Sequence, residues 1–172
     1  MPRASAIAVL VCALLAPLDP VHAALANQAS VEDLARTSDA VVRGRVERQT
    51  SRMVGRRIVT DVEIRVASVW RGTAPQRVTV TVPGGIVGDL GQRVDGMASF
   101  TEGEEVVVFV GHGSDGAWRV NGAAQGKFEV AAAQARPNLR DVKFLRSEVR
   151  SGERAAEPMP VAELERRVRE AR

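Results

Sequence analysis

Residues that carry thiol, imidazole and metal chemistry are scarce in this sequence of 172 residues. It contains one cysteine, two histidines, no tyrosine, two tryptophans and four phenylalanines. A single cysteine cannot form a disulfide within the chain, so a disulfide-stapled mini-protein is excluded. With 45% hydrophobic and 26% charged residues, the composition also excludes a disordered chain and a collagen-like repeat. The length allows one ordinary domain with a sizeable core.

The N-terminus has the pattern of a secretory signal peptide. Arg3 supplies a positive charge, residues 6–18 are mostly apolar, and small residues then precede two cleavage positions, after Ala23 or after Ala26. The apolar run is shorter than the roughly 20 residues that a membrane-spanning helix needs. We therefore predict that residues 1–23 are removed and that the protein is exported, to the periplasm or outside the cell. No transmembrane segment is expected after that removal.

Removal of the signal peptide would leave even fewer cysteine and histidine residues. Cys12 and His22 would leave with it, so the mature chain would keep one histidine, His112, and no cysteine. Thiol catalysis, cysteine-rich zinc sites and multi-histidine metal sites are then excluded, and we predict no cofactor and no metal. Aromatic side chains for base stacking are few, which argues against single-stranded nucleic acid as a partner.

Alternating apolar and polar residues dominate the remainder of the chain and predict β-strands. The alternation covers residues 40–47, 58–70 and 77–82, and shorter pieces occur around Trp118 and Phe128. Val106–Val110 has no alternation and is short, so we expect a strand that is covered on both faces. Glycines punctuate the junctions, which favours an antiparallel barrel or sandwich over a βαβ fold.

Helical patterns are expected only near the two ends of residues 27–172, which we predict to form a single domain. Ser30 as an N-cap and two acidic residues after it predict a short helix over residues 31–37. A second, amphipathic helix is predicted over residues 160–172, with Val161, Leu164, Val168 and Ala171 on one face, where it could cover one end of a barrel. Residues 138–150 fit a helix or a strand.

The most conspicuous local feature is a glycine-rich segment after a strand. It contains Gly84, Gly85 and Gly88 within residues 82–93. Such loops can cradle phosphate, but no Gly-Lys-Ser/Thr follows and no helix start is evident. A wide turn whose glycines permit positive φ is the favoured interpretation. Under the alternative, these three glycines are candidate ligand-binding residues.

His112 is the one candidate general base. Asp115 could orient it and Ser114 lies nearby in sequence. Because triads are assembled from separate segments, adjacent residues rarely form one, and a histidine flanked by glycines favours an exposed turn. We therefore predict no catalytic residue and keep His112 as a candidate binding residue.

Carboxylates offer a second route to catalysis. Five acidic residues are candidates for a hydrolytic pair: Asp61, Glu63, Asp95, Glu102 and Glu104. Asp61 and Glu63 share one face of a predicted strand with arginines, which favours cross-strand charge pairing on a solvated surface. None of the spacings resembles a calcium loop.

Arginines are frequent between the predicted strands over residues 40–47 and 58–70, which we expect to form the first hairpin. Arg48, Arg52, Arg56 and Arg57 have no acidic residue between them in sequence. Such a cluster could bind an anionic polymer, and an anionic glycan is a candidate partner.

Two resemblances extend these inferences. Residues 38–46, residues 58–70, Arg71-Gly72 and residues 78–80 resemble the opening of netrin-like and tissue-inhibitor-of-metalloproteinase-like domains. Residues 30–172 resemble a family of exported bacterial proteins of unknown function through the Pro83-Gly84-Gly85, Gly103-Glu104, Val106–Val110 and Gln125–Phe128 motifs. The first resemblance implies an OB-like barrel. Its inhibitors use an N-terminal cysteine and disulfides, which the mature chain lacks, so no inhibitory residue carries over.

Together these patterns predict a mainly β protein, a small antiparallel OB-like β-barrel with a short N-terminal helix and a C-terminal amphipathic helix. The favoured function is an exported, non-enzymatic binding or accessory module for an unknown protein partner, with association with an extracellular protease as one version. The alternatives are a carboxylate-dependent hydrolase of envelope or extracellular polymers and an anionic-glycan-binding protein.

Overall fold

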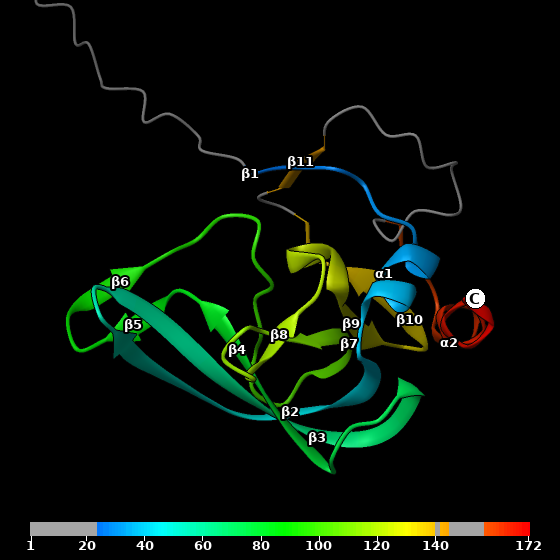
Figure 1. The fold of residues 1–172 in the computed structure, drawn as a ribbon, viewed down its shortest axis with the longest axis horizontal. Coiled ribbons are helices and arrows are strands. Elements are labelled where there is room, and N and C mark those ends of the chain that lie inside the picture. Colours follow the sequence, from blue (N-terminus) through cyan, green and yellow to red (C-terminus); the bar gives the residue numbers. More distant parts are fainter. Residues whose placement is uncertain (1–23, 140–141, 145–156) are drawn as a thin grey trace, which may run out of the picture.

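The computed structural model describes residues 24–139, 142–144 and 157–172, and the predicted signal peptide lies outside them. The chain is mainly β: 53% of these described residues lie in strands, and they contain two α-helices (Figure 1). The helices are α1 (Val31–Thr37) and α2 (Val161–Glu170), and a short 3₁₀ helix, η1, covers Ala123–Gly126. The mainly β prediction and both predicted helices are therefore confirmed.

Eight strands form one large mixed sheet in the order β12-β10-β9-β7-β2-β3-β4-β8. Their bounds are β2 Ala40–Val54, β3 Arg57–Gly72, β4 Arg77–Pro83, β7 Glu105–His112, β8 Trp118–Val120, β9 Lys127–Ala131, β10 Gln134–Pro137 and β12 Met159–Pro160. β8 pairs antiparallel with β7 as well as parallel with β4, so it contacts both. The parallel β4–β8 bridge departs from the purely antiparallel arrangement that the sequence predicted.

Two small sheets accompany the large one. β5 (Gly85–Val87) and β6 (Leu90–Gln92) form an antiparallel hairpin, and β1 (Ala24–Ala26) pairs in parallel with β11 (Val142–Phe144). β11 lies in the segment 138–150 that the sequence left open between helix and strand. Residues 142–144 are strand, and residues 140–141 and 145–150 lie outside the described residues.

β2 and β3 form the longest hairpin, joined by the two residues Gly55 and Arg56. Gly55 has φ of +59°, a left-handed conformation that two-residue hairpin turns favour. The ladder contains three register shifts, between Val41 and Val42, between Arg43 and Gly44 and between Val46 and Arg48. Because bulges increase local twist, they let this hairpin curl across the molecule (Figure 1).

Two hydrophobic clusters lie on opposite faces of the sheet. Alternate β7 residues, including Val107 and Phe109, join a cluster with α1, α2 and Trp70. Val106, Val108 and Val110 instead join the aliphatic side chains of β2, β3 and β4. The prediction that this valine strand is covered on both faces is therefore confirmed.

α2 packs beside α1 on the first cluster. The predicted apolar face, Val161, Leu164, Val168 and Ala171, is fully buried there. Arg167 of α2 is also buried, and its guanidinium binds the Glu32 carboxylate of α1 at 2.7 and 2.8 Å. This ion pair joins the N-terminal and C-terminal helices of the domain.

Candidate functional site

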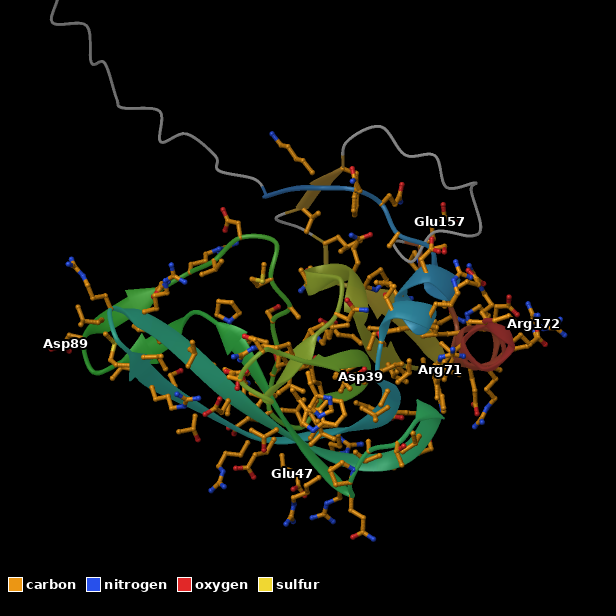
Figure 2. The ribbon with its side chains drawn as sticks, viewed as in Figure 1. Asp39, Glu47, Arg71, Asp89, Glu157 and Arg172 are labelled. Atoms are coloured by element: carbon orange, nitrogen blue, oxygen red, sulfur yellow. The ribbon has the colours of Figure 1, made fainter. Side chains whose placement is uncertain are left out.

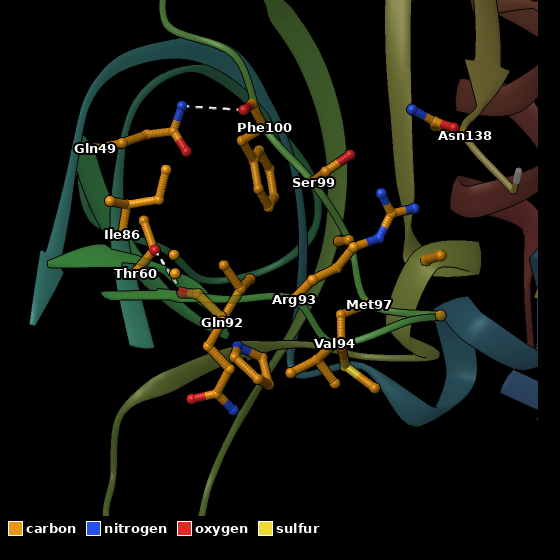
Figure 3. Close-up of a pocket in the computed structure, with 18 of the residues that line it drawn as sticks. Gln49, Thr60, Ile86, Gln92, Arg93, Val94, Met97, Ser99, Phe100 and Asn138 are labelled. Atoms are coloured by element: carbon orange, nitrogen blue, oxygen red, sulfur yellow. Dashed lines mark hydrogen bonds between the residues drawn. The ribbon is translucent and has the colours of Figure 1, made fainter. Parts of the chain in front are cut away.

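A cavity of about 740 Å³ lies where the β5–β6 hairpin meets the segment 93–100 and the large sheet (Figure 3). Most of its lining is apolar or carries neutral polar groups. The lining residues are Gln49, Thr60, Val82, Pro83, Gly84, Gly85, Ile86, Gly91, Gln92, Arg93, Val94, Gly96, Met97, Ala98, Ser99, Phe100, Ala124, Asn138 and Val142. The cavity thus combines residues from segments far apart in the chain.

The glycine-rich segment builds one wall of this cavity. Gly84 and Gly85 line it, and both have positive φ, +97° and +137°. A Cβ added to Gly85 would lie 2.4 Å from the hydroxyl oxygens of Ser51 and Thr60, so only glycine lets β5 approach the β2–β3 hairpin this closely. Gly88 lies instead in the β5–β6 turn, away from the lining. Of the three candidate glycines, two shape the cavity through backbone packing, as the favoured turn interpretation implies.

Hydrogen bonds fix the wall on the hairpin side. The Thr60 hydroxyl donates to the Gly84 carbonyl at 2.7 Å. The Ile58 backbone N–H donates to Gln92 Oε1 at 2.7 Å, and the Gly84 N–H donates to the Ile58 carbonyl at 2.8 Å. These bonds hold the cavity open on a rigid strand, with the Gln92 amide nitrogen left for another partner.

The opposite wall is an irregular segment with unused hydrogen-bonding groups. Among the described residues, the backbone groups of Met97, Ala98 and Ser99 have no hydrogen-bond partner, and neither do the side chains of Ser99 and Asn138. Gln49 fixes the end of this wall, because its Nε2 donates to the Phe100 carbonyl at 3.0 Å. The wall therefore presents backbone donors and acceptors beside apolar side chains.

A buried lysine supports the Phe100 ring. Lys127 Nζ lies 5.3 Å from the ring centroid, 2.9 Å from the Glu104 carboxylate and 3.1 Å from Glu129. The Lys127 side chain is only 2% exposed. The motif Gly126-Lys127-Phe128 thus places a cation between two carboxylates and an aromatic ring, behind the cavity wall.

His112 lies outside the cavity, at the end of β7. Its Nδ1 lies 2.9 Å from Asp39 Oδ2, and its ring stacks on Trp118 with centroids 3.7 Å apart. The His112 backbone N–H donates to the same carboxylate, and this bond lowers the pKa of Asp39 most. Asp115, the orienter weighed from sequence, instead binds Arg119 at 2.7 Å. The histidine is paired with a carboxylate, but among the described residues no serine, threonine or cysteine forms a hydrogen bond with its ring.

The five candidate carboxylates have separate partners. Asp61 binds Arg52 and Glu63 binds Arg48, which confirms cross-strand pairing. Hydrogen bonds from Arg52 lower the pKa of Asp61. Glu104 binds Lys127. Asp95 pairs with Arg93, and Glu102 accepts from the Gln49 backbone N–H. Within the described part of the chain, no two of them bind one group.

The predicted arginine cluster divides into two pairs. Arg48 and Arg52 are ion-paired across the hairpin, so the absence of acidic neighbours in sequence was misleading: the partners Glu63 and Asp61 lie on the adjacent strand. Arg56 and Arg57 lie at the turn and have no partner among the described residues. Two of the four arginines therefore remain available to a ligand.

The described residues contain no group of three or more histidine, cysteine or acidic side chains that could hold a metal ion. Neither of their helices has the length and apolar character to cross a membrane.

Sequence reasoning missed three features of this region: the unpaired backbone of residues 97–99, the Asp39 partner of His112 and the buried Lys127. Lys127 alternates with the apolar Phe128, so its position predicts a solvated face. Asp39 is 73 residues from His112, and no local pattern connects them. Comparison of the chain with models of known protein families, with curated proteins and with solved structures finds no match.

Proposed function

We propose that this protein is an exported, non-enzymatic binding module that holds an extended segment of a partner protein in the cavity beside the β5–β6 hairpin. The observation that carries the proposal is the segment Met97–Ser99. Its backbone groups have no partner among the residues that the structure describes, and they lie on the lining of a cavity of about 740 Å³.

The chemistry of the lining favours a peptide. An extended peptide adds to an unpaired backbone segment through main-chain hydrogen bonds, and apolar pockets accept its alternate side chains. Here Val94, Phe100 and Ile86 offer apolar surface, while the amides of Gln92 and Asn138 offer neutral donors and acceptors. A sugar or nucleotide phosphate would be better served by converging cations, whereas Arg93, the one cation among the described residues of the lining, is already paired with Asp95.

The dispersed carboxylates support binding over hydrolysis. A glycosidase-type site needs two carboxyl groups roughly 5–10 Å apart that face one substrate. Asp61, Glu63 and Glu104 each form an ion pair with a different cation, and the described residues of the cavity lining include no carboxylate. The ion-paired state of Arg48 and Arg52 likewise weakens the glycan alternative.

We also propose that the fold is an OB-like barrel and that the protein is exported. The cycle of pairings β7-β2-β3-β4-β8-β7 supports the barrel, because it matches the five-stranded order of that fold. The N-terminal charge, apolar run and small residues support export. The resemblance to inhibitor-like domains suggests that an extracellular protease could supply the bound segment.

The test is selection from a phage-displayed library of random linear peptides on the immobilised protein. We expect enrichment of peptides with alternating apolar residues. Ser99→Trp, which fills the cavity, should remove that enrichment. Ser114→Trp is the matched control, because Ser114 is also an exposed serine but lies in the β7–β8 turn. It should retain the enrichment.

Two results would overturn the proposal. One is a selection that enriches no sequence above the level of an empty support. The other is equal enrichment on the Ser99→Trp and unmodified proteins, since a cavity ligand could not tolerate the indole.

A further inference from the structure

Four of the five large exposed apolar side chains of the described residues lie at one end of the molecule. They are Met53 and Val54 at the end of β2 and Ile86 and Leu90 in the β5–β6 hairpin, whereas the fifth, Met97, lies at the cavity rim near η1. Their exposed fractions reach 72% for Ile86 and 63% for Leu90. Grouped exposure of this kind marks an interaction surface, because scattered single residues would be the ordinary case.

Two hairpin turns bring these residues together. Gly55-Arg56 closes the β2–β3 hairpin and Gly88-Asp89 closes the β5–β6 hairpin. The Ile58 N–H bond to Gln92 and the Ile86 N–H bond to Ser51 fasten one hairpin to the end of the other. Figure 1 shows both turns at the same tip of the molecule, opposite α2. We call this surface the hairpin tip and define it by Met53, Val54, Arg56, Arg57, Ile86 and Leu90.

The charge of the hairpin tip differs from that of the neighbouring sheet surface. Along the outer sheet, five arginines bind cross-strand carboxylates: Arg43 binds Glu105, Arg48 binds Glu63, Arg52 binds Asp61, and Arg65 and Arg77 share Glu47. Arg45 binds the Gly103 carbonyl instead. Arg56 and Arg57 have no such partner within the part of the chain that the structure describes. Asp89 is the one carboxylate of the two turns (Figure 2). The hairpin tip therefore keeps an excess positive charge beside apolar side chains.

We propose that the hairpin tip docks the protein onto an anionic phospholipid bilayer. Apolar side chains on two narrow turns can enter the boundary between headgroups and acyl chains, while arginines remain at headgroup level and bind phosphate. Binding then combines buried apolar area with attraction to anionic lipid. The proposal is independent of the peptide cavity, apart from Ile86, which belongs to both.

The shape of the hairpin tip favours a lipid surface over a protein partner. Two projecting turns offer little flat area, and a standard protein interface buries about 800 Å² on each side. A bilayer interface deforms around such turns, so their convex shape is no obstacle. A second copy of this chain is the competing occupant, and the experiment below separates the two.

The test is flotation of the purified exported protein with vesicles of phosphatidylcholine, with and without phosphatidylglycerol. We expect binding that needs phosphatidylglycerol and weakens as salt is raised. Arg56→Gln/Arg57→Gln should lower the partition coefficient by about 25-fold, since each arginine near an anionic surface contributes about fivefold. Met53→Ser/Val54→Ser/Leu90→Ser should lower it more than tenfold.

The matched control is Arg136→Gln/Arg172→Gln. It makes the same change in net charge with two exposed arginines that lie outside the hairpin tip. It should retain binding to within about twofold, and urea unfolding midpoints establish that every variant is folded. All proteins carry the same N-terminus, so differences between variants report on the hairpin tip.

Three outcomes would overturn the proposal. The first is no flotation of the unmodified protein at low salt, and the second is an equal loss in the control. The third is a concentration-dependent dimer in sedimentation that the Met53→Ser/Val54→Ser/Leu90→Ser variant abolishes, which would assign the hairpin tip to self-association.

Discussion

Replacement of Lys127 by methionine tests whether a buried ion pair supports the cavity wall. The Lys127 side chain is 2% exposed, and its ammonium group lies 2.9 Å from the carboxylate of Glu104, whose side chain is only 15% exposed. Glu129, the second partner, is 46% exposed and keeps its contact with water. Methionine preserves most of the stem volume and removes the charge, so the change isolates the electrostatic contribution.

The expected magnitude follows from the burial of the partner that remains. Removal of one member of a buried pair costs about 3–5 kcal/mol, because the other charge stays buried without compensation. Glu104 retains a hydrogen bond from the Thr101 N–H and some solvent, so we expect the low end, about 3 kcal/mol. Replacement of both members by neutral groups is often nearly neutral. Lys127→Met/Glu104→Gln should therefore recover most of the loss.

Urea unfolding followed by tryptophan fluorescence measures these free energies, with the slope m as a check on two-state behaviour. Glu129→Gln serves as the control and should cost less than about 1 kcal/mol, as exposed pairs do. A Lys127→Met loss below about 1 kcal/mol would refute the reasoning. So would a double variant whose loss equals the sum of the two single losses, because that additivity means no coupling between the charges.

Three further predictions concern the fold around the site. Gly85→Ala should lower the free energy of urea unfolding more than Gly88→Ala, because a Cβ at position 85 clashes with two hydroxyl groups. A Cβ at position 88 meets no atom, so Gly88→Ala costs only the strain of the left-handed conformation, about 1–2 kcal/mol. Equal losses in the two variants would contradict this reasoning. Leu164→Ala should cost about 3 kcal/mol, since this α2 side chain is fully buried, and a loss below about 1 kcal/mol would mean that α2 does not cover the core. Burial raises the pKa of Glu32, but hydrogen bonds, led by the one from Arg167, outweigh the effect of burial and hold the pKa below 4.5. The Glu32 carboxylate therefore stabilises the fold above pH 4.5, and this stabilisation is lost as the pH falls through the pKa of the folded state. Glu32→Gln should flatten the acid side of a plot of unfolding free energy against pH, and an unchanged slope would contradict the assignment.

Local patterns predicted the elements of the fold well. The Ser30 hydroxyl accepts the Asp33 N–H at 3.0 Å, so the capping pattern alone located α1. The period of α2 identified the four apolar residues that are buried, and the unbroken valines of β7 indicated two covered faces. These features depend on residues close in sequence, which is why they could be predicted.

Features that depend on distant residues could not be predicted in this way. Arg167 falls on a helical turn with charged neighbours, yet it is buried because Glu32, 135 residues away, neutralises it. The pairing of Arg48 and Arg52 depends on the register of β2 against β3, which three bulges shift. The cavity depends on where the segment 93–100 passes the hairpin, and glycine positions alone do not determine that path.

The two strands that pair with β2 lie at very different distances from it along the chain, so the two pairings should form at different times during folding. β2 and β3 are joined by two residues, so their pairing closes only a short loop and loses little chain entropy. β2 also pairs with β7, where Ala40 lies opposite Val110, and this pairing closes a loop that contains the whole intervening chain, so it loses more chain entropy. Since folding slows as contacts become less local, we expect the β2–β3 ribbon to form early and the docking of β7 to limit the rate. Both hydrophobic clusters need β7, so each should become protected from solvent in that one late step.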